Sequence, residues 1–258
     1  MFNIPSFYGF RSNSGGFDED YQAVLDYATT QTYTLPSESQ QALQNQLVVD
    51  LKDAGVWSKL DVFYVFATDG DSDFASINWK DPNSFEVTEV NSPTFTTDVG
   101  FTGNGTSSYI STNYIPNTDA INYSQNNASM MYFRQNNVSQ TKFITGHDGS
   151  RFNFCREDNS TRIWFNSNRS LTAADGSGAG FFMLTRDNSL TSIHYKGTST
   201  TTLDNVSTGL AASSILVLTG ASTSGFSNST IQLFSLGADL NSEASDFKTS
   251  IDSYLTSI

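Results

Sequence analysis

The chain has 258 residues, with 26 acidic and 13 basic side chains and a formal net charge of −13. This balance argues against nucleic acid and against an anionic membrane surface as partners, because both need clustered Lys and Arg. Charged residues make up only 15% and aromatic residues 13% of the chain, which is typical of a β-rich protein and not of a disordered one.

The sequence carries few signals of export or cross-linking. Its first residues lack a basic segment followed by an apolar core, so we expect no secretory signal. No apolar run reaches the roughly 20 residues that a membrane span requires. Cys155 is the single cysteine, which excludes an intrachain disulfide. It lies in a strand-like run, where we expect a buried and unreactive thiol.

The first 16 residues predict an N-terminal arm. The segment is too apolar for a solvated tail and too short to have a core of its own. Two interpretations stay open, since the arm can pack on its own domain or dock on a neighbouring subunit. The apolar side chains that would anchor it are Phe2, Phe7, Tyr8 and Phe10.

Helices are predicted before the first core strand. Residues 17–28 can form a short helix, and a stronger one is expected near 37–54, with Ser37 as N-cap and Gly55 just beyond its C-terminus. The apolar stripe of this second helix recurs every four residues at Leu43, Leu47 and Leu51.

Residues 60–67 are continuously apolar and predict a strand that is buried on both faces, with a helix on one of them. Farther along, Gly103, Asn104 and Gly105 predict a tight turn between a strand around Phe101 and a strand that begins near Tyr109.

Short strands at regular spacing follow, separated by Gly, Asn, Asp and Ser clusters. This pattern predicts an antiparallel two-sheet sandwich. An amphipathic C-terminal helix is expected near 241–256, with Asn241 as its N-cap. No linker or repeat divides residues 17–258, so we predict one domain. The candidate strands are residues 85–90, 128–134, 142–146, 151–155, 162–165, 180–186, 190–196, 214–219 and 230–236.

Three pieces occur in an order that is typical of one family. The first is the helix end at 52–57 that runs into the apolar strand, and the second is the 103–105 turn before Tyr109. The third is the strand end at 235–238 before the last helix. Together they resemble the concanavalin A-like or lamin-G-like jelly-roll domain of bacteriophage virion structural proteins. The resemblance covers about residues 37–258 and implies a component of the virion surface or tail.

An acidic cluster is the candidate metal site. Oxygen-rich loops bind calcium, a hard cation. The EF-hand pattern is not met, because its sixth and twelfth positions are Phe74 and Lys80, and a solvated turn is the alternative. The alternating carboxylates also match the pair of a sandwich-fold glycoside hydrolase, although Gly70 and Ser72 favour a turn. The acidic residues are Asp69, Asp71 and Asp73.

Aromatic side chains supply a candidate sugar platform, in which rings stack on the apolar faces of sugars. The alternative is core packing, the usual place of aromatic residues in a β domain. Trp79 is favoured because polar residues surround it in the sequence. The candidates are Trp79, Trp164, Tyr114 and Tyr123.

Catalytic signatures are not found. The sequence has two histidines, His147 and His194, but no Gly-x-Ser-x-Gly nucleophile motif that would accompany a catalytic histidine. We expect each to be structural or solvent-exposed. We therefore predict a non-enzymatic virion accessory protein, on the capsid or the tail, that needs no cofactor and contacts other virion proteins and its own copies. A lectin-like module for host glycans is the alternative, and a glycoside hydrolase is a third.

Overall fold

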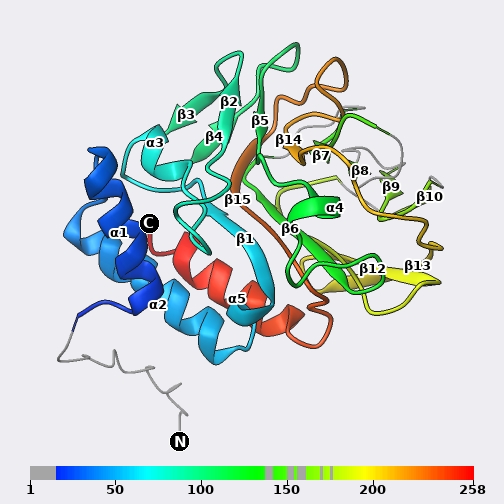
Figure 1. The fold of residues 1–258 in the computed structure, drawn as a ribbon, viewed down its shortest axis with the longest axis horizontal. Helices are drawn as coiled ribbons and strands as arrows, with labels where there is room; N and C mark the ends of the chain where they lie inside the picture. Colours follow the sequence, from blue (N-terminus) through cyan, green and yellow to red (C-terminus); the bar gives the residue numbers. More distant parts are fainter. Residues whose placement is uncertain (1–15, 137–141, 150–153, 156–160, 169–170, 175–176) are drawn as a thin grey trace, which may run out of the picture.

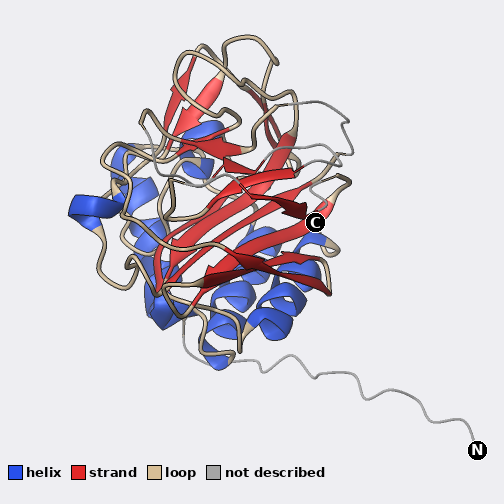
Figure 2. Cartoon of the chain, turned by 90° about the vertical axis from the view of Figure 1, so that its right-hand side faces the viewer, coloured by secondary structure: helices blue, strands red, loops and turns tan. Residues whose placement is uncertain are grey.

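The computed structural model describes residues 16–136, 142–149, 154–155, 161–168, 171–174 and 177–258. In this part of the chain three helices cover one face of a large antiparallel sheet, and smaller sheets lie over the other face (Figures 1 and 2). The predicted fold class, a mainly β antiparallel sandwich of the jelly-roll kind with helices at both ends, is confirmed.

The large sheet has β15 (Thr230–Gly237) at its centre. One long side of β15 pairs with β6 (Ala128–Arg134), and the other side pairs with β1 (Leu60–Val65) and β4 (Gly100–Thr102) at different points along its length. The described strands follow the order β13 (Ser199–Asp204), β12 (Thr191–Lys196), β11 (Gly180–Arg186), β6, β15, β4 and β3 (Thr94–Thr96).

The smaller sheets are built from short strands. One has the order β2 (Thr88–Val90), β5 (Tyr109–Ser111), β14 (Leu216–Val217) and β7 (Thr145–Gly146). The other has the order β10 (Leu171–Ala174), β9 (Thr161–Trp164) and β8 (Phe154–Cys155). The short turn η1 (Trp57–Lys59) leads directly into β1, and short helices lie between strands at α3 (Ser72–Ala75) and α4 (Pro116–Asp119).

The long helices begin and end at residues with clear local causes. α1 (Glu19–Gln31) starts after Asp18, whose carboxylate accepts the N–H of Asp20. α2 (Glu38–Asp53) starts after Ser37, whose hydroxyl accepts the N–H of Gln40, so the predicted N-cap is confirmed. Gly55 follows with φ +72°, as expected of a residue just beyond a helix C-terminus.

The last helix, α5 (Ala244–Leu255), starts later than predicted. Glu243 holds the N-cap position without a side-chain cap bond, so the expected cap at Asn241 is wrong. The Asn241 side chain instead accepts a hydrogen bond from the Tyr195 hydroxyl at 2.6 Å. None of the described helices is long and apolar enough to cross a membrane.

Both faces of β1 are buried, as its continuous apolar sequence predicts. Phe63 and Val65 pack toward α1, α2 and α5, while Val62 and Tyr64 pack toward the smaller sheets. The edge of β1 away from β15 is also covered. The Phe63 N–H donates to Asn78 Oδ1 at 3.0 Å, and the Phe63 carbonyl accepts the Trp79 N–H at 2.9 Å. This strand is therefore protected against edge-to-edge pairing.

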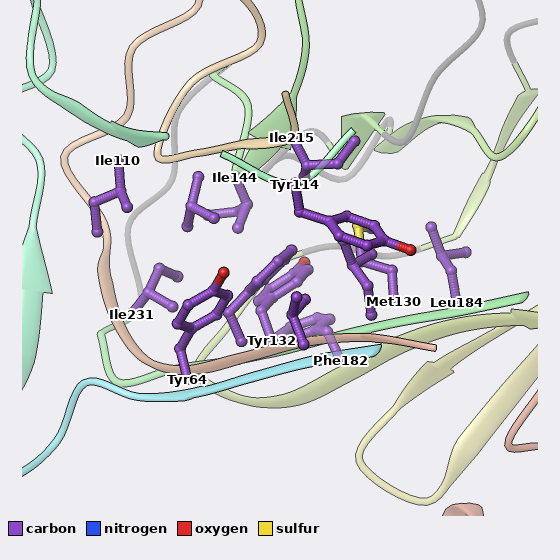
Figure 3. Close-up of a cluster of buried hydrophobic side chains, with 14 of the residues drawn as sticks. Tyr64, Ile110, Tyr114, Met130, Tyr132, Ile144, Phe182, Leu184, Ile215 and Ile231 are labelled. Atoms are coloured by element: carbon purple, nitrogen blue, oxygen red, sulfur yellow. The ribbon is translucent and has the colours of Figure 1, made fainter. Parts of the chain in front are cut away.

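The second core lies between the large sheet and the smaller sheets. Figure 3 shows Tyr64, Tyr132, Phe182 and Ile231 of the large sheet below Ile110, Ile144 and Ile215. The Tyr132 and Phe182 rings stack on adjacent strands with centroids 5.1 Å apart. This apolar layer joins the two halves of the sandwich.

The predicted strand–turn–strand at residues 100–111 is a connection between sheets. β4 belongs to the large sheet and β5 to a smaller one, so the intervening residues cross from one layer to the other. Asn104 Oδ1 accepts three successive N–H groups in this connection, from residues 106–108. Gly103 has no room for a side chain, because a Cβ would lie 2.1 Å from the Ser227 carbonyl oxygen.

Candidate functional site

A cleft of about 570 Å³ is lined by residues of β9, of the segments beside β7 and β9 and of the loop after β14. Its lining combines aromatic rings with hydroxyl, amide, imidazole and carboxylate groups. The lining residues are Phe143, His147, Asp148, Gly149, Trp164, Asn168, Gly220, Ala221, Thr223 and Ser224.

Two half-buried rings form the apolar part of the cleft. Trp164 is the last residue of β9, and Phe143 precedes β7. Their centroids are 6.3 Å apart and the ring planes meet at 53°. The N–H of Phe143 donates to the Gly225 carbonyl at 3.1 Å, which ties this residue to the loop on the other side of the cleft. The rings therefore make a fixed corner against which an apolar surface can pack.

His147 lies behind this corner and is 2% exposed. Its Nδ1 is 2.9 Å from Ser213 Oγ, and that hydroxyl donates to the Asp148 carbonyl at 2.7 Å. Because the Ser213 hydroxyl has a single hydrogen, Nδ1 carries the proton in the imidazole–hydroxyl contact. Burial lowers the pKa of His147 to about 4, against the opposing effect of Asp148, so the ring is neutral at pH 7.

Asp148 fixes the opposite loop. Its Oδ1 accepts the N–H of Ser222 at 2.7 Å. The Thr219 hydroxyl lies 2.7 Å from the Ala221 carbonyl and 2.9 Å from the Ser224 carbonyl, so the loop is also braced from inside. At its base the backbone packs directly on β7, since a Cβ at Gly146 would lie 2.0 Å from the Gly220 carbonyl oxygen. The loop is thus held as a defined wall.

Asn168 reaches the rim of the cleft from the segment that follows β9. The Asn168 N–H donates to the Thr208 hydroxyl at 2.9 Å, and the Thr208 N–H donates to the Asn166 carbonyl at 2.7 Å. Asn166, with φ +54°, is buried and accepts a hydrogen bond from the Tyr123 hydroxyl. The exposed amide of Asn168 therefore stands on an ordered support.

The structure places one of the four predicted platform residues in the cleft, Trp164. For the other three residues the prediction is wrong, because each is at most 2% exposed and cannot offer a ring face to a sugar. Trp79 packs among Tyr21, Phe63 and Phe74. The hydroxyls of Tyr114 and Tyr123 donate to Asp61 and Asn166, so both residues are parts of the core.

The prediction of a metal site at the acidic cluster is also wrong, because the carboxylates of Asp69 and Asp71 accept backbone N–H groups. Asp69 accepts the N–H of Ser37, and Asp71 accepts those of Thr34 and Phe74. Asp71 is the N-cap of α3. Burial, Asp71 and Glu86 raise the pKa of Asp73. Within the described ranges no three His, Cys, Asp or Glu side chains gather into a metal site.

Other predicted residues lie away from the cleft or outside the described part. His194 lies in β12, is 2% exposed, and packs near the Phe182 ring. The backbone of Cys155 lies in β8. The anchoring residues Phe2, Phe7, Tyr8 and Phe10 lie outside the described residues.

Sequence reasoning missed several cleft residues, among them Phe143, Asn168, Thr223 and Ser224. The sequence offers a faint signal for them. Two Gly-bounded polar stretches, 147–149 and 220–225, follow short strands, and the structure brings both to one place.

Comparison with known proteins gives a fold but no family. No family model and no curated protein match the chain. A mutant of HCR/D is 9% identical with a TM-score of 0.52, over 76% of this chain and 53% of that one. A mutant of Trypanosoma rangeli sialidase displaying trans-sialidase activity is 12% identical with a TM-score of 0.52, over 82% of this chain and 39% of that one.

This chain thus spans about half the length of HCR/D and about two-fifths of the sialidase. At such low identity the likeness shows the sandwich fold alone.

Proposed function

We propose that this protein is a carbohydrate-binding module whose ligand occupies the cleft at Trp164. The observation that carries the proposal is the fixed corner of two half-buried rings, Trp164 and Phe143, beside exposed polar side chains. Sugars present apolar C–H faces edged by hydroxyl groups, and a ring beside hydrogen-bonding groups matches both.

The polar groups of the cleft suit hydroxyl recognition. Asp148 is an acceptor, Asn168 is both donor and acceptor, and the hydroxyls of Thr223 and Ser224 can act as either. All four residues are exposed, so a ligand reaches them without a change of the core. The neutral His147 behind them keeps Asp148 in place through Ser213.

The size of the cleft suits a short oligosaccharide. Its volume of about 570 Å³ lies within the range of roughly 300–1,000 Å³ that is common for small-molecule sites. The bracing of the Asp148 loop and of Asn168 means that little ordering entropy is lost on binding.

Binding without hydrolysis is the activity that we propose. Glycoside hydrolysis uses a pair of carboxyl groups. Among the described lining residues Asp148 supplies one carboxylate, and its Oδ1 already accepts the Ser222 N–H. Incubation with the bound glycan and measurement of released reducing ends tests this point, and turnover would replace the proposal by a hydrolase.

A glycan array with purified protein, followed by calorimetric titration, tests the binding proposal. We expect Trp164→Ala to weaken the affinity at least tenfold, since it removes the stacking surface. Phe95→Ala is the matched control, a half-buried ring on the edge strand β3, and it should bind normally. The proposal fails if the wild type binds no glycan, or if Trp164→Ala binds as tightly as the wild type.

The place of this module on a virion stays a prediction from the sequence resemblance. Deletion of residues 1–16 tests the anchoring arm. The prediction requires that the truncated protein no longer joins phage particles, while its glycan binding is kept.

A further inference from the structure

Arg186, at the end of β11, is a buried cation outside the cleft. It is 1% exposed. Its Nη2 donates to the Asn205 carbonyl at 2.6 Å, and the guanidinium lies 5.5 Å from the centroid of the Phe165 ring. Its Nε and Nη1 have no hydrogen-bond partner among the residues that the structure describes. Two of its three nitrogen atoms are therefore buried with unused N–H donors.

The charge of Arg186 is also uncompensated. Among the described residues no carboxylate pairs with it. Burial lowers its pKa to about 10, so the side chain remains protonated at neutral pH. A buried guanidinium with unused donors is unfavourable, because water no longer solvates it and the protein does not replace that water.

An unused acceptor lies on the residue that contacts Arg186. Asn205 is fully buried, and within the described part of the chain its Oδ1 has no hydrogen-bond partner. The Nδ2 of the same amide makes two long contacts, 3.4 Å to Ser192 Oγ and 3.5 Å to the Phe165 carbonyl. Unused donors and an unused acceptor thus belong to two residues in direct contact.

We propose that Arg186 and Asn205 bind a small hydrogen-bond acceptor, either a water oxygen or a halide ion. A water molecule accepts from the guanidinium and donates to Asn205 Oδ1, so it uses both kinds of group. A halide ion only accepts, and it neutralises the charge. It requires the Asn205 amide to be turned, which exchanges Oδ1 and Nδ2 and breaks only the two long contacts.

The bound acceptor lies among residues from distant parts of the chain. Arg186 ends β11, Asn205 follows β13, and Phe165 follows the cleft residue Trp164. Because the guanidinium and the Asn205 amide both contact Phe165, the bound acceptor supports the segment that leads from β9. This inference stands on buried groups of its own and does not depend on glycan binding.

Crystals of the full chain, grown with sodium bromide and separately with sodium acetate, test the proposal. We expect density within hydrogen-bond distance of Arg186 Nε or Nη1. An anomalous bromine peak identifies a halide site. A peak without anomalous signal that also contacts Asn205 identifies water. The proposal is overturned if neither crystal has density within hydrogen-bond distance of these two nitrogens.

Thermal unfolding in the same two salts at equal ionic strength distinguishes a bound halide ion from a bound water molecule in solution. A halide site predicts a higher melting temperature in bromide for the wild type and no such difference for Arg186→Met, which lacks the donors. A water site predicts equal melting temperatures in both salts, together with the non-anomalous peak in the crystals. A bromide effect that persists unchanged in Arg186→Met contradicts a halide at this site.

Discussion

The two faces of the large sheet are built by different means. On the helix face, apolar side chains of α1, α2 and α5 pack on Phe63, Val65 and their neighbours. On the cleft face, the apolar core of Figure 3 is topped by short strands, tight glycine contacts and buried polar side chains. The helix face therefore stabilises the fold by the apolar area that it buries, while the cleft face holds its loops by specific hydrogen bonds.

Asp61 shows how the cleft face holds its loops. Its carboxylate accepts the Tyr114 hydroxyl and the N–H groups of residues 121–123, all within 3.1 Å. One side chain of β1 thereby fixes the loop that precedes β6. A feature of this kind depends on a single residue and is not built from a repeated pattern.

The largest effect is expected from a cavity on the helix face. Phe247 of α5 is fully buried, with its ring centroid 5.8 Å from that of Phe181. Phe247→Ala should lower the free energy of unfolding by about 4 kcal/mol, measured by urea denaturation. Glycan affinity should be unchanged while the variant is folded. A loss below about 1 kcal/mol would show that this face is not a packed core.

On the cleft face, Asp61→Asn should lower the free energy of unfolding by about 3 kcal/mol. The substitution replaces one carboxylate oxygen by an NH₂ group, which cannot accept any of the four hydrogen bonds that Asp61 receives. Urea denaturation measures the loss. Asp98→Asn, whose carboxylate accepts the Gln40 amide, is a control in which one bond is changed. If the two variants lose the same stability, Asp61 does not fix the loop as we describe.

Acid should lower the free energy of unfolding through protonation of His147. Its pKa is about 4 in the folded chain and 6.5 ordinarily, so between these values the unfolded chain binds more protons. The stability that the neutral ring contributes is therefore full above pH 6.5 and is lost as the pH falls toward 4, by up to about 3 kcal/mol.

Comparison with His147→Gln isolates this contribution from that of the many carboxylates, which titrate in a similar pH range. The difference in unfolding free energy between wild type and variant should shrink as the pH falls from 7 to 4. A difference that stays constant over this range means that His147 does not titrate on unfolding.

The smallest effect is expected in the connection between the sheets. Gly105 has φ +74° and space for a Cβ, so Gly105→Ala should cost about 1 kcal/mol through its backbone alone. Gly105→Asn should cost less, since Asn tolerates this conformation. Equal losses in both variants, measured by thermal unfolding, would point to packing as the cause.

The parts that sequence predicted well repeat a pattern over many residues. β6 and β11 have the predicted bounds, and the helix near 37–54 is α2 within one residue at each end. Periodicity captures such elements because each buries a face. β13 was missed, since its Thr-rich sequence lies at the edge of the sheet and is mostly exposed. β3 and β10, of three and four residues, are too short to show a period.

The candidate site was harder to predict, because burial of an aromatic ring does not follow from its neighbours in sequence. Trp79 was favoured because Asn78 and Lys80 flank it, yet Asn78 serves the edge of β1 and the Trp79 ring lies in the helix-side core. The cleft depends on loops 147–149 and 220–225 meeting, and those loops share no pattern that marks them as partners.

Tryptophan fluorescence during glycan titration tests the central claim most directly. The chain has three tryptophans, and Trp57 and Trp79 are 4% and 1% exposed in the helix-side core. With the tightest glycan from the array, we predict an emission change that Trp57→Phe retains and Trp164→Phe abolishes. No change at saturating glycan, or a full change in Trp164→Phe, would contradict a ligand stacked in the cleft.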